Sequence, residues 1–157
     1  MEFIIKIHRE TFKQIIDFAN NNPFLECGGY LIGKIKENEN QMTFIITAAF
    51  LDENQGTKNR YHFFELTRKY LEEYCKVHMK NYKVIGNFHS HGEYPAIFSK
   101  EDKIMEENSP NNFCHLIYSP KYEEINGEIH IDGKKTAKAR VTFFGKNREI
   151  TTNIVKR

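Results

Sequence analysis

The sequence lacks a marked excess of charge of either sign. Its 157 residues include 23 lysines and arginines and 21 aspartates and glutamates, which leaves a formal net charge of +2. A protein that binds nucleic acid through its phosphates needs a clustered basic excess. The charge balance therefore gives little support for a nucleic-acid partner.

Cysteine pairs are also missing. The three cysteines, Cys27, Cys75 and Cys114, are far apart, and no C-x-x-C unit is present that would indicate a zinc knuckle or a redox motif. Free thiols are typical of a reducing compartment. We therefore expect a cytoplasmic protein whose cysteines are free.

Long apolar runs are absent as well. The longest, FIITAAFL at residues 44–51, is far too short to cross a bilayer. The first ten residues, MEFIIKIHRE, have no basic stretch followed by a long apolar one. The sequence therefore predicts neither a secreted nor a membrane-anchored protein.

Strand and helix patterns alternate along a chain whose length suits a single domain, residues 1–157. Runs rich in β-branched and aromatic residues predict strands, and runs with helical periodicity predict helices. The expected strands are residues 3–7, 30–36, 42–51, 83–89, 113–119 and 137–145, and the expected helices are residues 9–22, 66–78 and 99–109. The pattern indicates an α/β or α+β sandwich around one core.

Two details of this pattern can be tested directly. In the helix 66–78, the spacing predicts a buried stripe made of Leu66, Tyr70, Leu71, Tyr74 and Cys75. Further along, the dipeptide at residues 126–127 is Asn-Gly, which favours the tight turn of a β-hairpin.

The segment NFHSHGEYPAIFSKED, residues 87–102, has the spacing of a metal site. Side chains two apart in a strand point to the same face, so His89 and His91 can aim at one point while Ser90 faces away. A helix that begins at Ser99 can bring Asp102 back toward the same point. Three protein ligands without cysteine are typical of a catalytic zinc site, which keeps one coordination position open.

Each part of this segment also has an ordinary structural explanation. Ser99 and Asp102 have the S-x-x-D spacing of a helix capping box, and two histidines at the end of a strand can be packed or exposed residues. The whole pattern H-x-H-x7-S-x2-D, however, arises by chance on the order of once in a few thousand such sequences. The combination therefore favours a metal site.

Hydrolysis at such a zinc needs a base that takes a proton from water, usually a carboxylate within hydrogen-bond reach. Glu93 and Glu101 are candidates inside the segment. Glu26, in FLECGGYLIG, is another, because it stands at the mouth of a strand beside two glycines that allow close backbone approach. Spacing alone leaves the choice open.

Taken together, these residues resemble the JAMM metalloproteases, also called the JAB or MPN-plus family. The segment from Glu26 to Gly33 matches the pattern E-x-x-G-x-L-x-G, and the segment from His89 to Asp102 matches H-[ST]-H-x7-S-x2-D. The resemblance extends from about Ile4 to Phe144. It implies that family's fold, a mixed β-sheet flanked by helices and of the cytidine-deaminase-like type.

The resemblance also implies a role for each matched residue. His89, His91 and Asp102 would bind one Zn²⁺ per chain, Glu26 would be the general base, and Ser99 would donate a hydrogen bond to the oxyanion of the reaction. The implied activity is that of a deubiquitinase-like isopeptidase. It would cut the amide bond after the C-terminus of a ubiquitin-like protein, for deconjugation or tail maturation, including in bacterial antiphage systems that conjugate such modifiers.

Other readings of the same fold stay open. One is a non-catalytic MPN-fold scaffold, although such scaffolds normally lack at least one of the ligands. Another is a hydrolase of a small peptide or amide, and a third is a relative that works on DNA repair complexes, for which the weak basic balance gives little support.

Two departures from the family pattern bear on the substrate. Gly92 follows the second histidine where the family often has proline, and the chain has no room for the long insertions with which some eukaryotic members grip ubiquitin. We expect substrate contacts from residues 52–60 and 92–98, because specificity tends to reside in loops. A substrate tail could add as a strand along a free sheet edge.

The remaining histidines have no partner at ligand spacing. We predict that all five bind no metal: His8, His62, His78, His115 and His130. Cys27, next to Glu26, should point to the opposite face of its strand and so lie outside the site.

Overall fold

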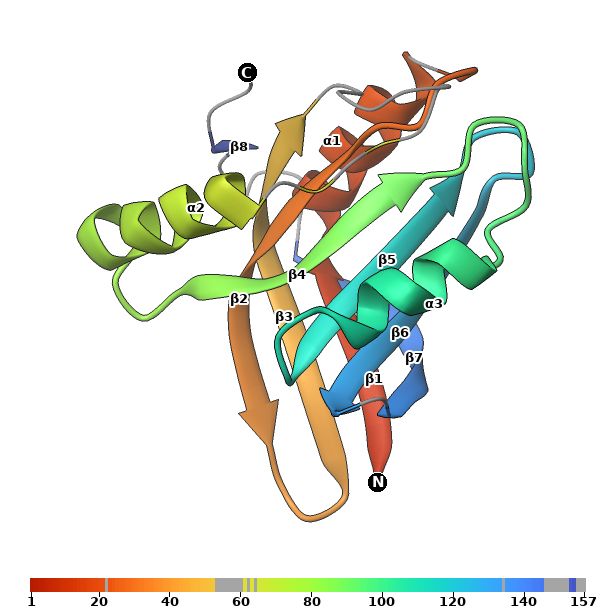
Figure 1. Cartoon of the computed structure of the whole chain (residues 1–157). Helices are drawn as coiled ribbons and strands as arrows, with labels where there is room; N and C mark the ends of the chain where they lie inside the picture. Colours follow the sequence, from red (N-terminus) through yellow and green to blue (C-terminus); the bar gives the residue numbers. More distant parts are fainter. Residues whose placement is uncertain are drawn as a thin grey trace.

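The structure is a computed structural model that describes residues 1–21, 23–52, 61, 63, 65–133, 135–145 and 153–154. Its strands are β1 (Glu2–His8), β2 (Gly28–Glu37), β3 (Gln41–Asp52), β4 (Lys83–Ser90), β5 (Phe113–Ser119), β6 (Glu124–Asp132), β7 (Lys135–Phe144) and β8 (Asn153–Ile154). Its helices are α1 (Arg9–Asn20), α2 (Glu65–His78) and α3 (Lys100–Glu107). Every strand and helix expected from the sequence is present (Figure 1).

The strands form one mixed sheet in the order β1-β7-β6-β5-β4-β2-β3-β8. β1 pairs in parallel with β7 on one side and with β3 on the other, so the two ends of the sheet meet. As a result, each of β1 to β7 has a neighbouring strand on both sides. The strands twist strongly about one another, as Figure 1 shows.

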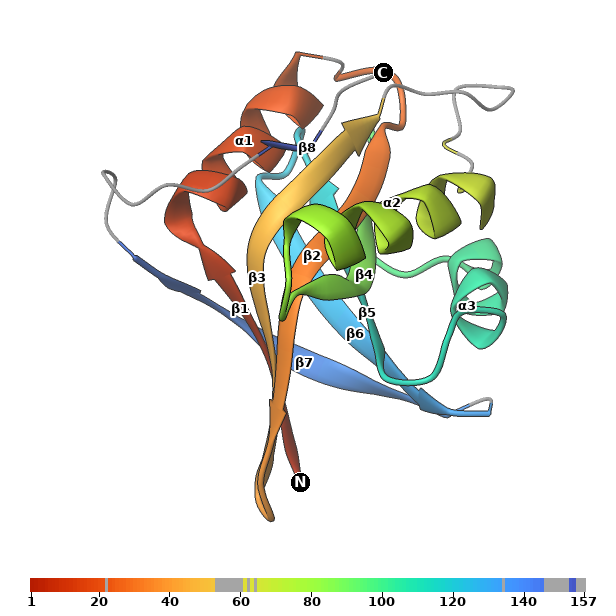
Figure 2. The ribbon, with the colours of Figure 1, turned by 90° about the vertical axis from the view of Figure 1, so that its left-hand side faces the viewer.

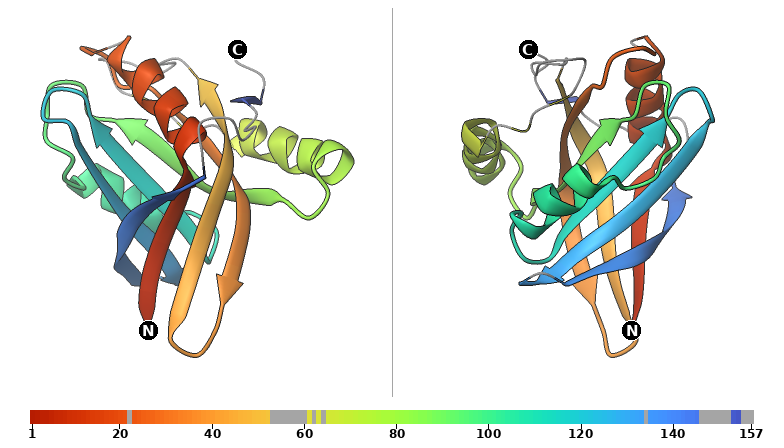
Figure 3. Two further views of the ribbon diagram at one scale, coloured as in Figure 1. Left: turned by 180° about the vertical axis from the view of Figure 1, so that it is seen from behind. Right: turned by 45° about the vertical axis from the view of Figure 1, so that its right-hand side comes forward.

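Helices cover both faces of the sheet. α1 lies on one face, and α2 and α3 lie on the other (Figure 2); seen from behind, α1 crosses in front of the strands (Figure 3). Buried side chains of α1, among them Ile15 and Phe18, pack with Phe44 and Phe88 of the sheet. A second, smaller cluster holds α2 against the opposite face. The fold is therefore an α/β sandwich, and the predicted fold class is confirmed.

The predicted stripe on α2 is partly wrong. The buried residues are Thr67, Leu71 and Cys75, whereas Leu66 is 80% exposed and Tyr70 53% exposed. The helix contacts the sheet along one narrow line with a spacing of four residues, because it extends away from the strands (Figure 1). Leu66 and Tyr70 lie beyond that line.

The predicted hairpin turn at residues 126–127 is also wrong. Asn126 and Gly127 lie inside β6 and pair with Ile117 and Leu116 of β5. A Cβ at 127 would lie 2.5 Å from Cδ1 of Ile5, so a larger residue there would push the end of that side chain aside. The chain turns instead before β6, and again after it at Gly133, whose φ is +56°.

Candidate metal centre and active site

β4 carries the two histidines to the end of the sheet. His89 pairs with Ile117 of the parallel strand β5, and the N–H of His91 continues the pairing by donating to the carbonyl of Tyr118 at 3.0 Å. Both histidines are buried. Their imidazoles point the same way, as the strand geometry predicts.

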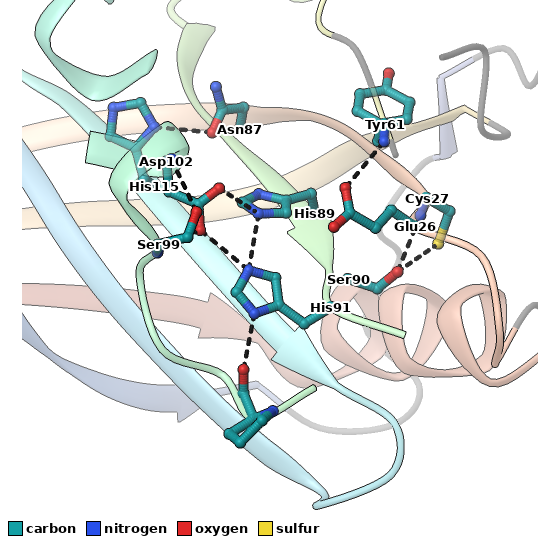
Figure 4. A network of polar contacts seen from close by, with 11 residues as sticks. Glu26, Cys27, Tyr61, Asn87, His89, Ser90, His91, Ser99, Asp102 and His115 are labelled. Carbon is teal, nitrogen blue, oxygen red and sulfur yellow. Dashed lines mark hydrogen bonds and ion pairs between the residues drawn. The ribbon is translucent and has the colours of Figure 1, made fainter. Parts of the chain in front are cut away.

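Ser90, between the two histidines, faces the other way and holds β4 to the start of β2. Its N–H donates to the carbonyl of Cys27 at 2.8 Å, and its Oγ accepts from the N–H of Cys27 at 2.9 Å. Cys27 is buried and its Sγ contacts Ser90 Oγ at 3.4 Å, on the side away from the histidines (Figure 4). The prediction that Cys27 points away from the site is confirmed.

The loop after His91 orients that histidine. Gly92 has φ +58°, a conformation that proline cannot adopt, which explains why glycine stands where the family often has proline. Nδ1 of His91 lies 2.7 Å from the carbonyl oxygen of Pro95. Because a carbonyl only accepts, Nδ1 carries the proton and Nε2 presents its lone pair to the site.

α3 delivers the third group. Ser99 is the N-cap: its Oγ accepts from the N–H of Asp102 at 3.1 Å, and Asp102 Oδ2 accepts from the N–H of Ser99 at 2.8 Å. This is the capping box predicted from the sequence. The cap fixes the Asp102 carboxylate so that it faces the two histidines (Figure 4).

The three side chains meet at one point. His89 Nε2 and His91 Nε2 are 3.1 Å apart, Asp102 Oδ1 is 3.1 Å from His89 Nε2, and Asp102 Oδ2 is 3.1 Å from His91 Nε2. Together they form a group that could hold a metal ion. Ligands of a tetrahedral zinc with bonds near 2.0–2.1 Å lie about 3.3 Å apart, so the spacing fits a zinc ion.

Electrostatics point to the same conclusion. Burial opposes ionisation of Asp102, but the hydrogen bonds to His89 and His91 outweigh it and hold the pKa of that carboxyl well below its ordinary value. Burial disfavours the charged form of His91, yet the hydrogen bonds to Asp102 and Pro95 prevail and raise its pKa. The buried carboxylate of Asp102 thus favours positive charge at this point, carried by a proton on His91 or by a metal ion.

Glu26 stands beside this group, immediately before β2. One carboxylate oxygen accepts a hydrogen bond from the N–H of Tyr61 at 3.0 Å, and the carboxylate is turned toward His89 (Figure 4). The other candidate bases, Glu93 and Glu101, are exposed. The charge of Glu26 also contributes to the raised pKa of His91, in keeping with its position near the group.

Sequence reasoning missed three contributors: the Ser90 hydroxyl, the carbonyl of Pro95 and the N–H of Tyr61. Two of these are main-chain groups, which every residue has, so no residue type signals them. Ser90 was visible only as the residue between two histidines.

Of the other histidines, His115 is buried between Asn87 and Ser109, at 2.9 Å and 3.0 Å. His8 accepts from the N–H of Glu10 and caps α1. Within the described ranges, the one group of three metal-ligating side chains is that of His89, His91 and Asp102; that His8, His78, His115 and His130 bind no metal stays a prediction. His62 and residues 53–60 of the expected substrate loop lie outside the described residues.

Residues 8–129 match the family of prokaryotic homologs of the JAB domain. The match covers more than half of the chain, so the protein belongs to this family. The predicted resemblance is thereby confirmed.

Two individual proteins are similar to the chain. COP9 signalosome complex subunit 5 of Gibberella zeae is 24% identical over 138 residues, which are 84% of this chain and 39% of that relative. The chain thus spans about two fifths of the length of this curated relative. The solution structure of protein DSY2949 from Desulfitobacterium hafniense superposes with a TM-score of 0.69 at 18% identity, over 92% of this chain and 96% of that one, and shows a shared fold.

None of the described helices is long and apolar enough to cross a membrane.

Proposed function

We propose that this protein is a zinc-dependent amide hydrolase of the JAMM type. The observation that carries the proposal is the convergence of His89, His91 and Asp102 within 3.1 Å of one another, with the Glu26 carboxylate turned toward them. Two nitrogens and one oxygen are the donor set of an open, catalytic zinc site, whereas structural zinc is usually closed by four ligands that include cysteine.

His89, His91 and Asp102 would hold the ion, and their geometry is already fixed by β4, Pro95 and the Ser99 cap. When bound, zinc would supply Lewis acidity, lowering the pKa of a water molecule and polarising the carbonyl that is attacked. The remaining work falls to residues of the chain.

Glu26 is the proposed general base. It takes a proton from the attacking water as the oxygen bonds to the carbonyl carbon, and it passes that proton to the nitrogen as the C–N bond breaks. The products are a carboxylate and an amine. The free carboxylate oxygen is available for this transfer, because the N–H of Tyr61 engages the other one.

Ser99 is the proposed oxyanion donor. Its Oγ accepts from Asp102 N–H, an interaction that leaves the hydroxyl proton to donate. A fixed donor at the position where negative charge develops stabilises the transition state more than the ground state. Helix capping and oxyanion binding can therefore be done by the same side chain.

For the substrate, we propose the C-terminal tail of a ubiquitin-like protein, as a conjugate or a precursor, and we propose residues 1–157 as one catalytic domain. Family membership and the likeness to a COP9 signalosome subunit support this choice. The presence of all three ligands and of Glu26 speaks against a non-catalytic scaffold. The hydrolase of small peptides remains the competing proposal.

The expectation that a substrate tail pairs with a free sheet edge beside the metal group is wrong for the described strands. β2 and β4, which flank the group, are each paired on both sides among the described strands. Among the described strands, the ends of β2 and β4 are therefore the proposed approach for a tail.

A cleavage panel tests the function. Wild type, Glu26→Gln and Ser99→Ala, each loaded with zinc, are given fluorogenic amides of ubiquitin-like C-terminal domains and of matching short tail peptides. We expect the wild type to cleave the full-domain substrates with the higher kcat/KM, and Glu26→Gln to lose about 10²–10⁴-fold. Equal rates on domains and short peptides would favour the small-peptide hydrolase. Cleavage unaffected by Glu26→Gln would overturn the mechanism.

A further inference from the structure

Tyr61 reaches the proposed base from outside the sequence motifs. Its main-chain N–H donates to Glu26 Oε1 at 3.0 Å, although the two residues are 35 positions apart. Glu26 is half-buried and stands just before β2, and this contact fixes one oxygen of its carboxylate (Figure 4). A glutamate side chain has several rotatable bonds, so one fixed oxygen restricts where the other can point.

The side chain of Tyr61 anchors this N–H to the sheet. Its hydroxyl donates to Asp52 Oδ2 at 3.3 Å, at the end of β3. Its ring lies directly against Gly28, where a Cβ would be 2.8 Å from the ring and 2.6 Å from the carbonyl oxygen of Phe88. Tyr61 is only 8% exposed. Glycine at 28 thus leaves the room that the ring occupies beside the strand that follows Glu26.

The hydroxyl is held in its donor form. Burial, followed by the charge of Asp52, raises the pKa of Tyr61 far above the range in which it could ionise at neutral pH. At neutral pH the hydroxyl therefore keeps the proton that it donates to Asp52.

Phe63, two residues after Tyr61, also contacts a residue of the metal group. The Phe63 ring packs edge-to-face on Tyr61, with centroids 4.7 Å apart, and edge-to-face on His89, at 6.1 Å. One aromatic unit therefore contacts both the base and one of the histidines. A shift of this unit would move Glu26 relative to the metal group.

We propose that Tyr61 is a positioning residue for Glu26: its N–H holds one carboxylate oxygen, and its ring and hydroxyl hold the N–H in place on Gly28 and Asp52. This inference rests on the proposed function of Glu26. A displacement of about 1 Å at a reacting group can cost about 100-fold in rate, so the loss of this anchor should appear in kcat. Metal binding and substrate affinity should change little, because Tyr61 contributes no ligand.

The first test reads the hydrogen bond itself, without activity. In ¹⁵N-labelled, chelator-treated protein, the amide proton of Tyr61 is expected downfield, as for an N–H bonded to a carboxylate. Glu26→Gln should move it clearly upfield while the amide of Phe63 stays in place. A Tyr61 amide that does not respond to Glu26→Gln overturns the inference, whatever the enzyme cleaves.

The second test separates positioning from general damage. Tyr61→Ala should lower kcat about 10–100-fold with KM changed less than about 3-fold and zinc still at one per chain. Tyr61→Phe, which keeps the ring and the N–H, should recover most of the rate. Tyr74→Leu is the matched control, since Tyr74 packs against the core cluster of α2 while its ring contacts are with Tyr70 and His78.

The outcomes distinguish the two proposals. An equal loss of kcat in Tyr61→Ala and Tyr74→Leu, or a rise in KM alone, would overturn the role of Tyr61 and leave the function intact. A zinc-loaded wild type that cleaves no amide would overturn the function, and the role of Tyr61 in catalysis with it.

Discussion

Glu106 should make the protein less stable as the pH rises. It lies on the inner face of α3 with 0% exposure, and neither carboxylate oxygen has a hydrogen bond of ordinary geometry. Glu128, on β6 beneath it, is also buried and forms an ion pair with Lys103. Burial, followed by the charge of Glu128, raises the pKa of Glu106 from 4.5 to about 8.

The sign of the effect follows from which state holds the proton. Between about pH 4.5 and about pH 8 the unfolded chain has released the Glu106 proton while the folded chain retains it. The free energy of unfolding therefore falls as the pH rises through this window, and the penalty is complete above it. At about 1.4 kcal/mol per pH unit, the shift sets a ceiling of about 5 kcal/mol. Because relaxation of the surroundings and entry of water reduce the penalty for a buried charge, we expect about 2 kcal/mol.

Glu106→Gln removes the charge while keeping the shape. We expect this variant to melt about 4–8 °C above the wild type at about pH 8.5, and less than about 2 °C above it at about pH 5. Thermal unfolding followed by circular dichroism, with chelator present so that metal binding adds nothing, measures the difference. Glu107→Gln, the neighbouring but exposed acid, is the control and should show no pH-dependent gain. A rise in melting temperature for Glu106→Gln that is equal at both pH values would show that the Glu106 charge does not destabilise the fold.

Three further predictions follow from the site and the fold. Zinc affinity, measured by competition with a chromophoric chelator, should weaken at least about 10-fold from pH 8 to pH 6, because the raised pKa of His91 lets a proton compete with the metal. A zinc affinity that does not change with pH would exclude His91 as a ligand. Gly28→Ala should lower the free energy of unfolding in urea by about 2–4 kcal/mol, because its Cβ would lie 2.6 Å from the Phe88 carbonyl oxygen. In Gly133→Ala the Cβ meets no atom within 4 Å, so this control should lose only about 1 kcal/mol, from its positive φ. Gly92→Pro introduces the residue that the family often has, but it should weaken zinc binding, because proline cannot adopt φ +58° and the loop would shift the Pro95 carbonyl that orients His91. Unchanged zinc affinity would show that the loop does not orient His91.

The metal group could be predicted from the sequence because its geometry is local. Two histidines on one strand and an aspartate in the next helical turn are placed by the periods of strand and helix alone. Ser99 and Asp102 could be read as a capping box for the same reason. The Glu26 carboxylate was different: its place beside His89 depends on the antiparallel pairing of β2 with β4. The local pattern made Glu26 one of three candidate bases, and only the family resemblance singled it out.

The parts that sequence reasoning missed depend on contacts between distant segments. The closure of the sheet through β1 is made by parallel pairings that no local pattern encodes. Asn126 and Gly127 have the chemistry of a turn, but both pair with β5, and Gly127 also pairs with Ala139 of β7, so they form part of a strand. The exposure of Leu66 and Tyr70 reflects where α2 meets the sheet, which helical periodicity does not specify.

A zinc titration tests the central claim most directly. Chelator-treated wild type, Glu26→Gln and Asp102→Asn are titrated with Zn²⁺ in a calorimeter, and bound metal is counted after gel filtration. We predict one tightly bound zinc per chain in the wild type and in Glu26→Gln, and a zinc affinity at least about 100-fold weaker in Asp102→Asn. A wild type that binds no zinc, or an Asp102→Asn variant that binds it equally well, would contradict the assignment of His89, His91 and Asp102 as a catalytic metal centre.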